Sequence, residues 1–137
     1  MTKVYLITAG ISGFIAVSMG AVGSHLLMGN ISPEHMAAFN TAVQMQMFHT
    51  LAILSLAIFI PHIRPSLINS IFYLFVAGII FFSLPVYLIS TAEVTQLSVG
   101  AISFLPPIGG ISFMLGWLAL IWSGVSYLNH NKSHKLD

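Results

Sequence analysis

The sequence predicts an all-α integral membrane protein, folded as a single four-helix bundle with both termini in the cytoplasm. Its 137 residues are 57% hydrophobic and only 5% charged, whereas a soluble domain carries about 25% charged residues. The mean hydropathy is +0.95. The apolar residues also gather into runs long enough for a helix to cross a hydrocarbon core of about 30 Å.

Spans are expected at about 4–28, 33–60, 66–90 and 107–128, with an outer loop at 91–106 and a polar, disordered tail at 129–137. These segments make residues 1–137 one membrane domain and leave no soluble domain. The first run is too long for the core of a cleaved signal peptide, so we expect a retained helix.

The orientation follows from the basic residues. Lys3, Arg64, Lys132 and Lys135 all fall on one side of the predicted bundle. The positive-inside rule places that side in the cytoplasm. A bacterial inner (plasma) membrane is the expected location.

Small residues recur at alternating spacings of four and three in the first and last spans. The key positions are Gly13 and Gly20 in the first span, and Gly109 and Gly116 in the last. Small residues let helix backbones approach closely in lipid, where no hydrophobic force drives packing. The pattern predicts close contacts, either within one bundle or at the seam of a homo-oligomer.

The second span has a clear start, because Ser32 is a suitable N-cap and Pro33 a suitable first helical residue. A continuous helix from Pro33 to Ile60 would be about 42 Å long, which exceeds the core. We favour this continuous helix. The alternative is an interfacial segment followed by a span that begins near Asn40.

The third span is rich in Phe and carries Tyr73 and Tyr87 near opposite ends, as interfacial anchors do. Pro85 removes a backbone donor and predicts a kink near the outer end. The loop that follows is long and half apolar, so we expect it to lie on the mouth of the bundle.

Polar side chains enter the second span between Thr41 and Thr50. On a helical wheel, Asn40, Thr41 and Gln44 lie on one flank, and His35, Gln46, His49 and Thr50 lie on another. An unpaired polar group in lipid is costly. Both flanks are therefore expected to touch neighbouring helices, which would make this span the central one. Interhelical hydrogen bonding alone would explain these residues. A polar pocket is the alternative.

The pocket, in the outer half of the bundle, would be formed by His25, Gln44, Gln46, His49, Tyr87 and Pro107. No carboxylate lies within the spans, and the adjacent Ser24 and His25 do not make a catalytic triad, so a non-enzymatic protein is expected. The chain has no cysteine and a net charge of only +1. We therefore expect no thiolate metal site, no cofactor and no nucleic-acid partner.

The favoured function is to bind or pass a small molecule or lipid, or to assist a membrane-protein partner; a homo-oligomer is left open. One alternative is a redox protein with a quinone site or a histidine-ligated haem. His25 and His49 differ in height by about 18 Å if the second helix is continuous, and by under about 8 Å if it starts at Asn40. A purely structural interaction module is the other alternative.

Four stretches resemble one family in their order along the chain: GAVGSH (20–25), FNTAVQMQMFH (39–49), LPPIGG (105–110) and Gly116-Trp117. The family is the small four-helix inner-membrane proteins catalogued as domain of unknown function 423. Leu26 to Met28 and Leu84-Pro85 depart from its usual pattern. The resemblance implies a four-helix plasma-membrane protein and no particular activity.

Overall fold

The computed structural model describes the backbone of residues 2–133, and the side chains as far as residue 126 with the exception of His62. Within this part the chain is all-helical, without strands. Four helical segments are long and apolar enough to cross a membrane, which confirms the predicted fold class. The elements are α1 (Thr2–Val22), η1 (Gly23–Leu27), α2 (Pro33–Phe59), η2 (Ile60–His62), α3 (Pro65–Gly78), η3 (Ile79–Ser83), α4 (Leu84–Ser90), α5 (Ala92–Thr95), η4 (Gly100–Ile102) and α6 (Leu105–Ser133).

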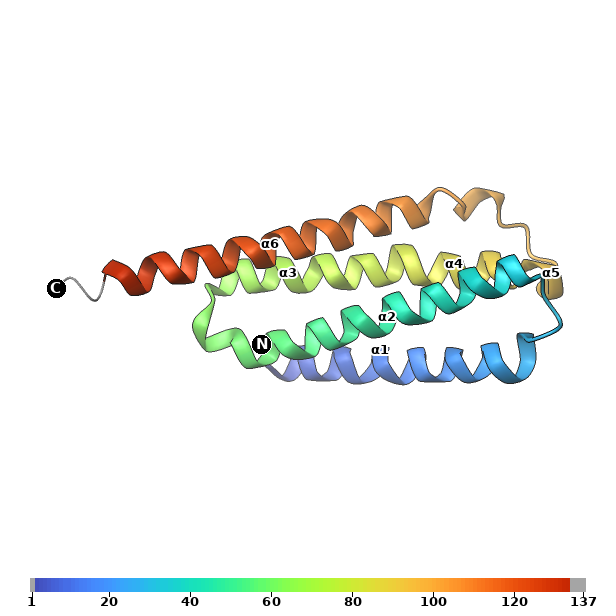
Figure 1. The fold of residues 1–137 in the computed structure, drawn as a ribbon, viewed down its shortest axis with the longest axis horizontal. Coiled ribbons are helices and arrows are strands. Elements are labelled where there is room, and N and C mark those ends of the chain that lie inside the picture. Colours follow the sequence, from blue (N-terminus) through green and yellow to red (C-terminus); the bar gives the residue numbers. More distant parts are fainter. Residues whose placement is uncertain (1, 134–137) are drawn as a thin grey trace.

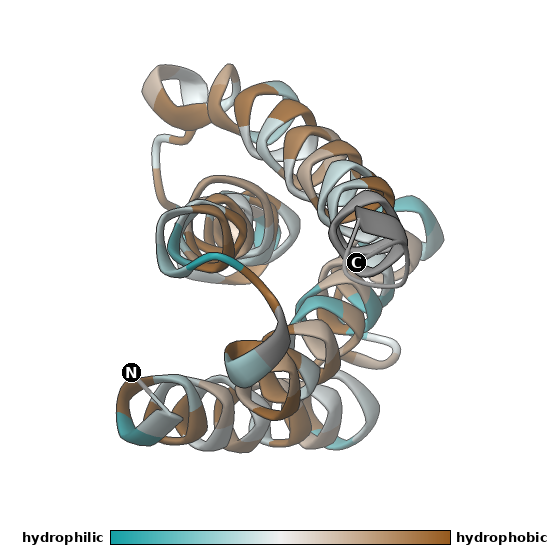
Figure 2. Ribbon diagram, turned by 90° about the vertical axis from the view of Figure 1, so that its left-hand side faces the viewer, coloured by the Kyte–Doolittle hydropathy of each residue, from teal (hydrophilic) through white to brown (hydrophobic). Residues whose placement is uncertain are grey.

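The long helices run side by side along the longest axis of the molecule (Figure 1). The start of α1, the α2–α3 connection and the last turns of α6 lie toward one end. The α1–α2 connection and α5 lie at the other. Seen end-on, α1 and α6 occupy opposite edges of the bundle (Figure 2). Helix α6 continues into the predicted polar tail and ends at Ser133; the rest of that tail is outside the described residues.

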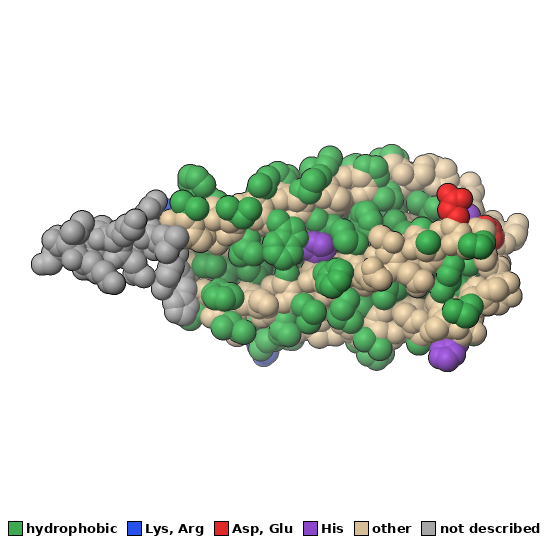
Figure 3. All heavy atoms as spheres, in the orientation of Figure 1, with side chains coloured by type: hydrophobic (Ala, Val, Ile, Leu, Met, Phe, Trp, Pro, Cys, Tyr) green, Lys and Arg blue, Asp and Glu red, His purple; other side chains and the backbone are tan. Residues whose placement is uncertain are grey.

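The surface has the character of a protein that faces lipid. Large apolar side chains are exposed on every span, including Phe14, Ile58, Tyr73 and Trp122. Figure 3 shows them covering the length of one face, with the acidic side chains gathered at the α5 end. Because a bilayer solvates apolar atoms, this distribution is stable only in a membrane.

Helix α2 is continuous from Pro33 to Phe59, as favoured above. Ser32 caps it, since its hydroxyl accepts a hydrogen bond from the backbone N–H of His35 at 3.3 Å. Such a cap satisfies one of the donors left free at a helix start.

The third span contains a π-helical turn, η3, immediately before Pro85. A proline in a helix lacks a donor and clashes with the carbonyl of the preceding turn. The π turn widens the helix just before the proline. Since π turns and prolines are both recognised causes of kinks, it lies where the sequence predicts one.

Two helix pairs use small residues in different ways. A side chain on Gly109 of α6 would collide with the backbone of Phe81 and Phe82 in η3, so the two backbones nearly touch there. Gly13 and Gly20 of α1 face α2 with more room. Added Cβ atoms would lie 3.6 Å from Thr50 and 3.8 Å from Val43, which is ordinary contact. The small residues of α1 and those of α6 both face helices of the same chain.

Candidate functional site

Gln46 is the centre of the polar network inside the bundle. Its side chain is 3% exposed and its amide nitrogen donates to the backbone oxygen of Ser12 in α1 at 3.0 Å. Its amide oxygen accepts a hydrogen bond from the Tyr87 hydroxyl of α4 at 2.8 Å. One side chain of α2 therefore connects the first span to the third.

The network continues along the bundle in both directions from Gln46. The hydroxyls of Ser12 and Thr50 lie 2.6 Å apart and share a hydrogen bond between α1 and α2. Toward the α5 end, the buried Ser83 hydroxyl donates to the carbonyl of Ala42 at 3.2 Å. These contacts pair polar groups that would otherwise be costly at membrane depth.

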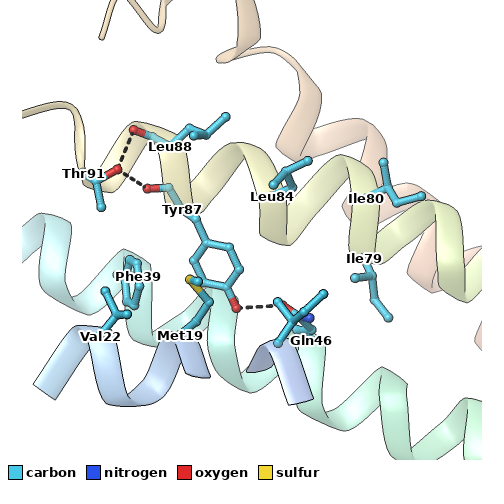
Figure 4. Close-up of a pocket in the computed structure, with 11 residues that line it drawn as sticks. Met19, Val22, Phe39, Gln46, Ile79, Ile80, Leu84, Tyr87, Leu88 and Thr91 are labelled. Atoms are coloured by element: carbon cyan, nitrogen blue, oxygen red, sulfur yellow. Dashed lines mark hydrogen bonds between the residues drawn. The ribbon is translucent and has the colours of Figure 1, made fainter. Parts of the chain in front are cut away.

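Tyr87 and Gln46 also line a groove of about 400 Å³ between α1 and the third span. Figure 4 shows the Tyr87 ring pointing from α4 toward Gln46, with Met19 and Phe39 beside it. A smaller cavity of about 210 Å³ shares Ile15 and Gln46 and extends the groove toward Thr8. Apart from a few polar groups, the walls of the groove and of this extension are apolar.

Helix α1 packs mainly on α2 and makes little contact with the third span. The groove between α1 and the third span is therefore long. From Thr8 to Val22 the lined part of α1 rises about 21 Å, compared with a core of about 30 Å. A polar contact between α1 and the third span lies near the start of α1, where the Tyr5 hydroxyl donates to Asn69 at 2.6 Å. The Tyr5 ring also stacks on Phe72 there, with centroids 4.4 Å apart.

The polar groups that line the groove of about 400 Å³ between α1 and the third span have already used their hydrogen-bond donors. The Gln46 amide nitrogen donates to the backbone oxygen of Ser12 at 3.0 Å and to its hydroxyl at 3.4 Å, and the Tyr87 hydroxyl donates to Gln46. The Thr91 hydroxyl donates to the carbonyl of Tyr87 at 2.8 Å. Only oxygen acceptors remain, so an anionic or carbonyl ligand would find no donor on these side chains.

His49 lies on another side of α2, in a separate groove of about 600 Å³ toward α6. Its Nε2 accepts a hydrogen bond from the indole N–H of Trp117 at 3.1 Å. Because an indole only donates, the imidazole proton is on Nδ1, which donates to the carbonyl of Met45 at 2.7 Å. The ring stacks on Phe113 with centroids 3.5 Å apart. Both nitrogens of His49 are therefore occupied.

The remaining candidates of the predicted pocket lie elsewhere. His25 on η1, Gln44 on α2 and Pro107 on α6 are all exposed and line none of these grooves. The expectation that both polar flanks of the second span touch neighbouring helices is wrong for Asn40, Thr41 and Gln44, which are exposed. The buried residues of α2, among them Phe39, Ala42 and Gln46, lie on the opposite side of the helix.

The continuous α2 also bears on the haem alternative. The condition that would bring His25 and His49 to similar heights was a span beginning near Asn40, and the helix begins at Pro33 instead. Among the described residues, no three His, Asp or Glu side chains form a group that could hold a metal ion.

Glu93, which the sequence places only in a loop, lies on α5 and contacts the start of α2. Its carboxylate accepts a hydrogen bond from the Ser32 backbone N–H at 2.8 Å and lies 2.5 Å from Nδ1 of His35. The Ser32 N–H, the Ser32 side chain and His35 together hold the pKa of the Glu93 carboxyl below its ordinary value. The loop after the third span thereby contacts the start of α2.

Four apolar spans and a lipid-facing surface define a multi-pass membrane protein. The model of the family described as "Protein of unknown function (DUF423)" matches residues 19–110. The chain belongs to this family.

The relatives agree with this assignment. The UPF0382 membrane protein YwdK of Bacillus subtilis is 34% identical over 92% of this chain and 99% of its own length. The UPF0382 inner membrane protein YgdD of Escherichia coli K12 is 34% identical over 98% of each chain. A UPF0382 membrane protein of Staphylococcus aureus, SAB0533, is 35% identical over 87% of this chain and 93% of its own. No solved structure matches the chain.

Proposed function

We propose that this protein is a non-enzymatic membrane protein that holds a lipid hydrocarbon chain in the groove between α1 and the third span. The observation that carries the proposal is the groove itself, which is lined by Ile15, Met19 and Val22 from α1 and by Leu84 and Leu88 from α4. Its walls match the chemistry of an acyl chain, and it opens sideways on a surface that faces lipid.

Two further features support a hydrocarbon chain over a polar solute. The donors of Gln46, Tyr87 and Thr91 are used inside the protein, so a charged or carbonyl-bearing solute would lose its water without gaining a partner. The lined length of α1, about 21 Å, also exceeds half of a core of about 30 Å. A chain in this groove would extend past the middle of the bilayer.

The orientation that accompanies this proposal places both termini in the cytoplasm. Lys3 and Arg64 lie toward the end that carries the termini, and Glu34 and Glu93 lie toward the other. Positive charge is retained on the cytoplasmic side. The groove then extends into the outer leaflet, with Glu93 at the outer surface.

Photocrosslinking in vesicles tests the function. The protein is reconstituted in phosphatidylethanolamine and phosphatidylglycerol that contain a small fraction of phospholipid with a diazirine on its acyl chain. Crosslinks should concentrate on Ile15, Met19 and Leu84 compared with Phe14 and Trp122, which face lipid elsewhere.

A groove-filling variant sharpens this test. Leu84→Trp places an indole in the cavity and should remove the groove crosslinks, because the chain and the indole would compete for one volume. Ile121→Trp, a matched change on the exposed face of α6, should leave them unchanged. An even distribution of crosslinks over all lipid-facing side chains would contradict a held chain.

A further inference from the structure

The outer half of α2 presents an unusual face to lipid. Asn40, Thr41 and Gln44 are exposed on it. Among the described side chains, no large apolar one is exposed on α2 between Pro33 and Met47, whereas Phe48, Leu51 and Ile58 are exposed further along the helix. The lipid-facing sides of the other spans are predominantly apolar.

These polar residues lie at membrane depth. Gly20 of α1 faces Val43, next to Gln44 in sequence, so Gln44 and Gly20 are at similar heights. Beyond that level Leu26 of η1 and Met28 just after it are exposed to their surroundings. On the other side, Ser83 bonds to the carbonyl of Ala42, and Leu84 is exposed at the next position. Hydrocarbon-compatible surface therefore extends outward past Gln44 on both neighbouring walls.

The carboxamides of Asn40 and Gln44 have no hydrogen-bond partner among the side chains and backbone that the structure describes. A polar group that faces lipid without a partner is costly, and such groups normally face another helix or a wet cavity. Neither groove described above is lined by these residues. Their partner must therefore come from outside this chain.

We propose that a second copy of this chain packs against this face, so that the protein is a homodimer with α2 against α2. A carboxamide is both donor and acceptor, and two copies of Gln44 related by a two-fold axis can each donate to the other's oxygen. Ala37, Thr41, Gln44, Phe48, Leu51 and Ser55 follow one another at spacings of four and three, which is the seam of a left-handed helix pair.

Self-complementarity favours a second copy over an unrelated partner. The same residue meets itself at the axis of such a dimer, so Gln44 can supply both halves of the hydrogen-bonded pair. Ala37, Thr41 and Ser55 are small enough for the backbones to approach closely. The dimer would leave the groove between α1 and the third span open, because that groove lies on the other side of α2.

Disulfide trapping in native membranes is the first test, and the cysteine-free sequence makes each introduced thiol unique. Ala37→Cys lies on the proposed seam near the outer end of α2. Leu26→Cys is a matched control on the exposed surface of η1, at the same end of the first span. Oxidation should give a covalent dimer of Ala37→Cys and not of Leu26→Cys. Equal trapping of both, or trapping of neither, overturns the proposal.

Energy transfer between labelled copies in diluted vesicles is the second test. Gln44→Leu should lower the dimerisation constant about three- to thirtyfold, the equivalent of a lost interhelical hydrogen bond. Gln44→Asn keeps the carboxamide and should retain most of the association. A dimerisation constant that is unchanged in Gln44→Leu, or crosslinking of Ala37→Cys to a different protein only, overturns the proposal.

Discussion

The contact between α6 and the third span and the contact between α1 and α2 both use small residues, yet they are built differently. Gly109 lies so close to the backbone of η3 that no side chain fits, and Gly116 lies close against the Phe75 ring. Gly13 and Gly20 have space for a methyl group. The comparison teaches that a stripe of small residues predicts a contact without predicting its closeness. The closer backbone contact is that of α6 with the third span, and α1 borders the groove.

The largest effect should come from Gly109→Ala. The added Cβ would meet the backbone of Phe81 and Phe82, which cannot rotate aside as a side chain can. We expect a loss of about 3 kcal/mol in unfolding free energy, the upper end for overpacking, measured by thermal unfolding in detergent. Gly20→Ala is the matched control and should be neutral, or stabilising by up to about 1 kcal/mol. Equal losses at both positions would erase the distinction between the two contacts.

Gln46→Leu should have the next largest effect. It removes the bonds to Ser12 and Tyr87 and leaves buried polar atoms unpaired, at a cost of about 1–3 kcal/mol. Gln44→Leu should leave the unfolding of the monomer in dilute detergent unchanged, because Gln44 makes no hydrogen bond within the described part of its own chain. If both variants unfold alike, the two faces of α2 do not differ as described.

Tyr5→Phe should have a smaller effect. It removes the bond to Asn69 near the inner end of the groove and keeps the aromatic ring that stacks on Phe72. We expect a loss of about 0.5–1.5 kcal/mol in the same thermal assay. A loss as large as that of Gly109→Ala would mean that the α1 side is as tightly built as the α6 side.

The smallest effect should be a pH dependence at the α5 end of the bundle. Because the pKa of Glu93 is lowered in the folded protein, its ionised form stabilises the fold. That contribution is complete above the ordinary pKa of a Glu, about 4.3, and is lost as the pH falls through the lower folded value. Glu93→Gln should flatten this acid limb in thermal unfolding measured against pH. An identical acid limb in the variant would show that Glu93 does not contribute to it.

The sequence was sufficient for the fold class, because the length and apolarity of a membrane span are local properties. The start of α2 could also be predicted, since a serine followed by a proline is a local signal for an N-cap and a first helical residue. The candidate site was less accessible. A helical wheel separates Gln44 from Gln46, but it does not say which flank meets a neighbour.

The missing information concerned distant contacts. Trp117 is far from His49 in the sequence, and nothing local in either residue marks the indole as the donor to the imidazole. The contact of Glu93 with Ser32 likewise depends on how the outer loop turns back. Ser12 and Tyr87 join the Gln46 network only through the packing of α1 and α4 against α2, which no local pattern predicts.

The π turn in the third span sets the rotational phase of everything beyond it. Relative to a regular helix, η3 accommodates an extra residue, and each residue of an α-helix corresponds to about 100° of rotation. If the same residues formed a regular α-helix without the π turn, α4 would be turned by about that angle. Tyr87 would then point away from Gln46, and the groove would lose its polar wall without any change to the residues that form it. The π turn is therefore as much a part of the site as the side chains.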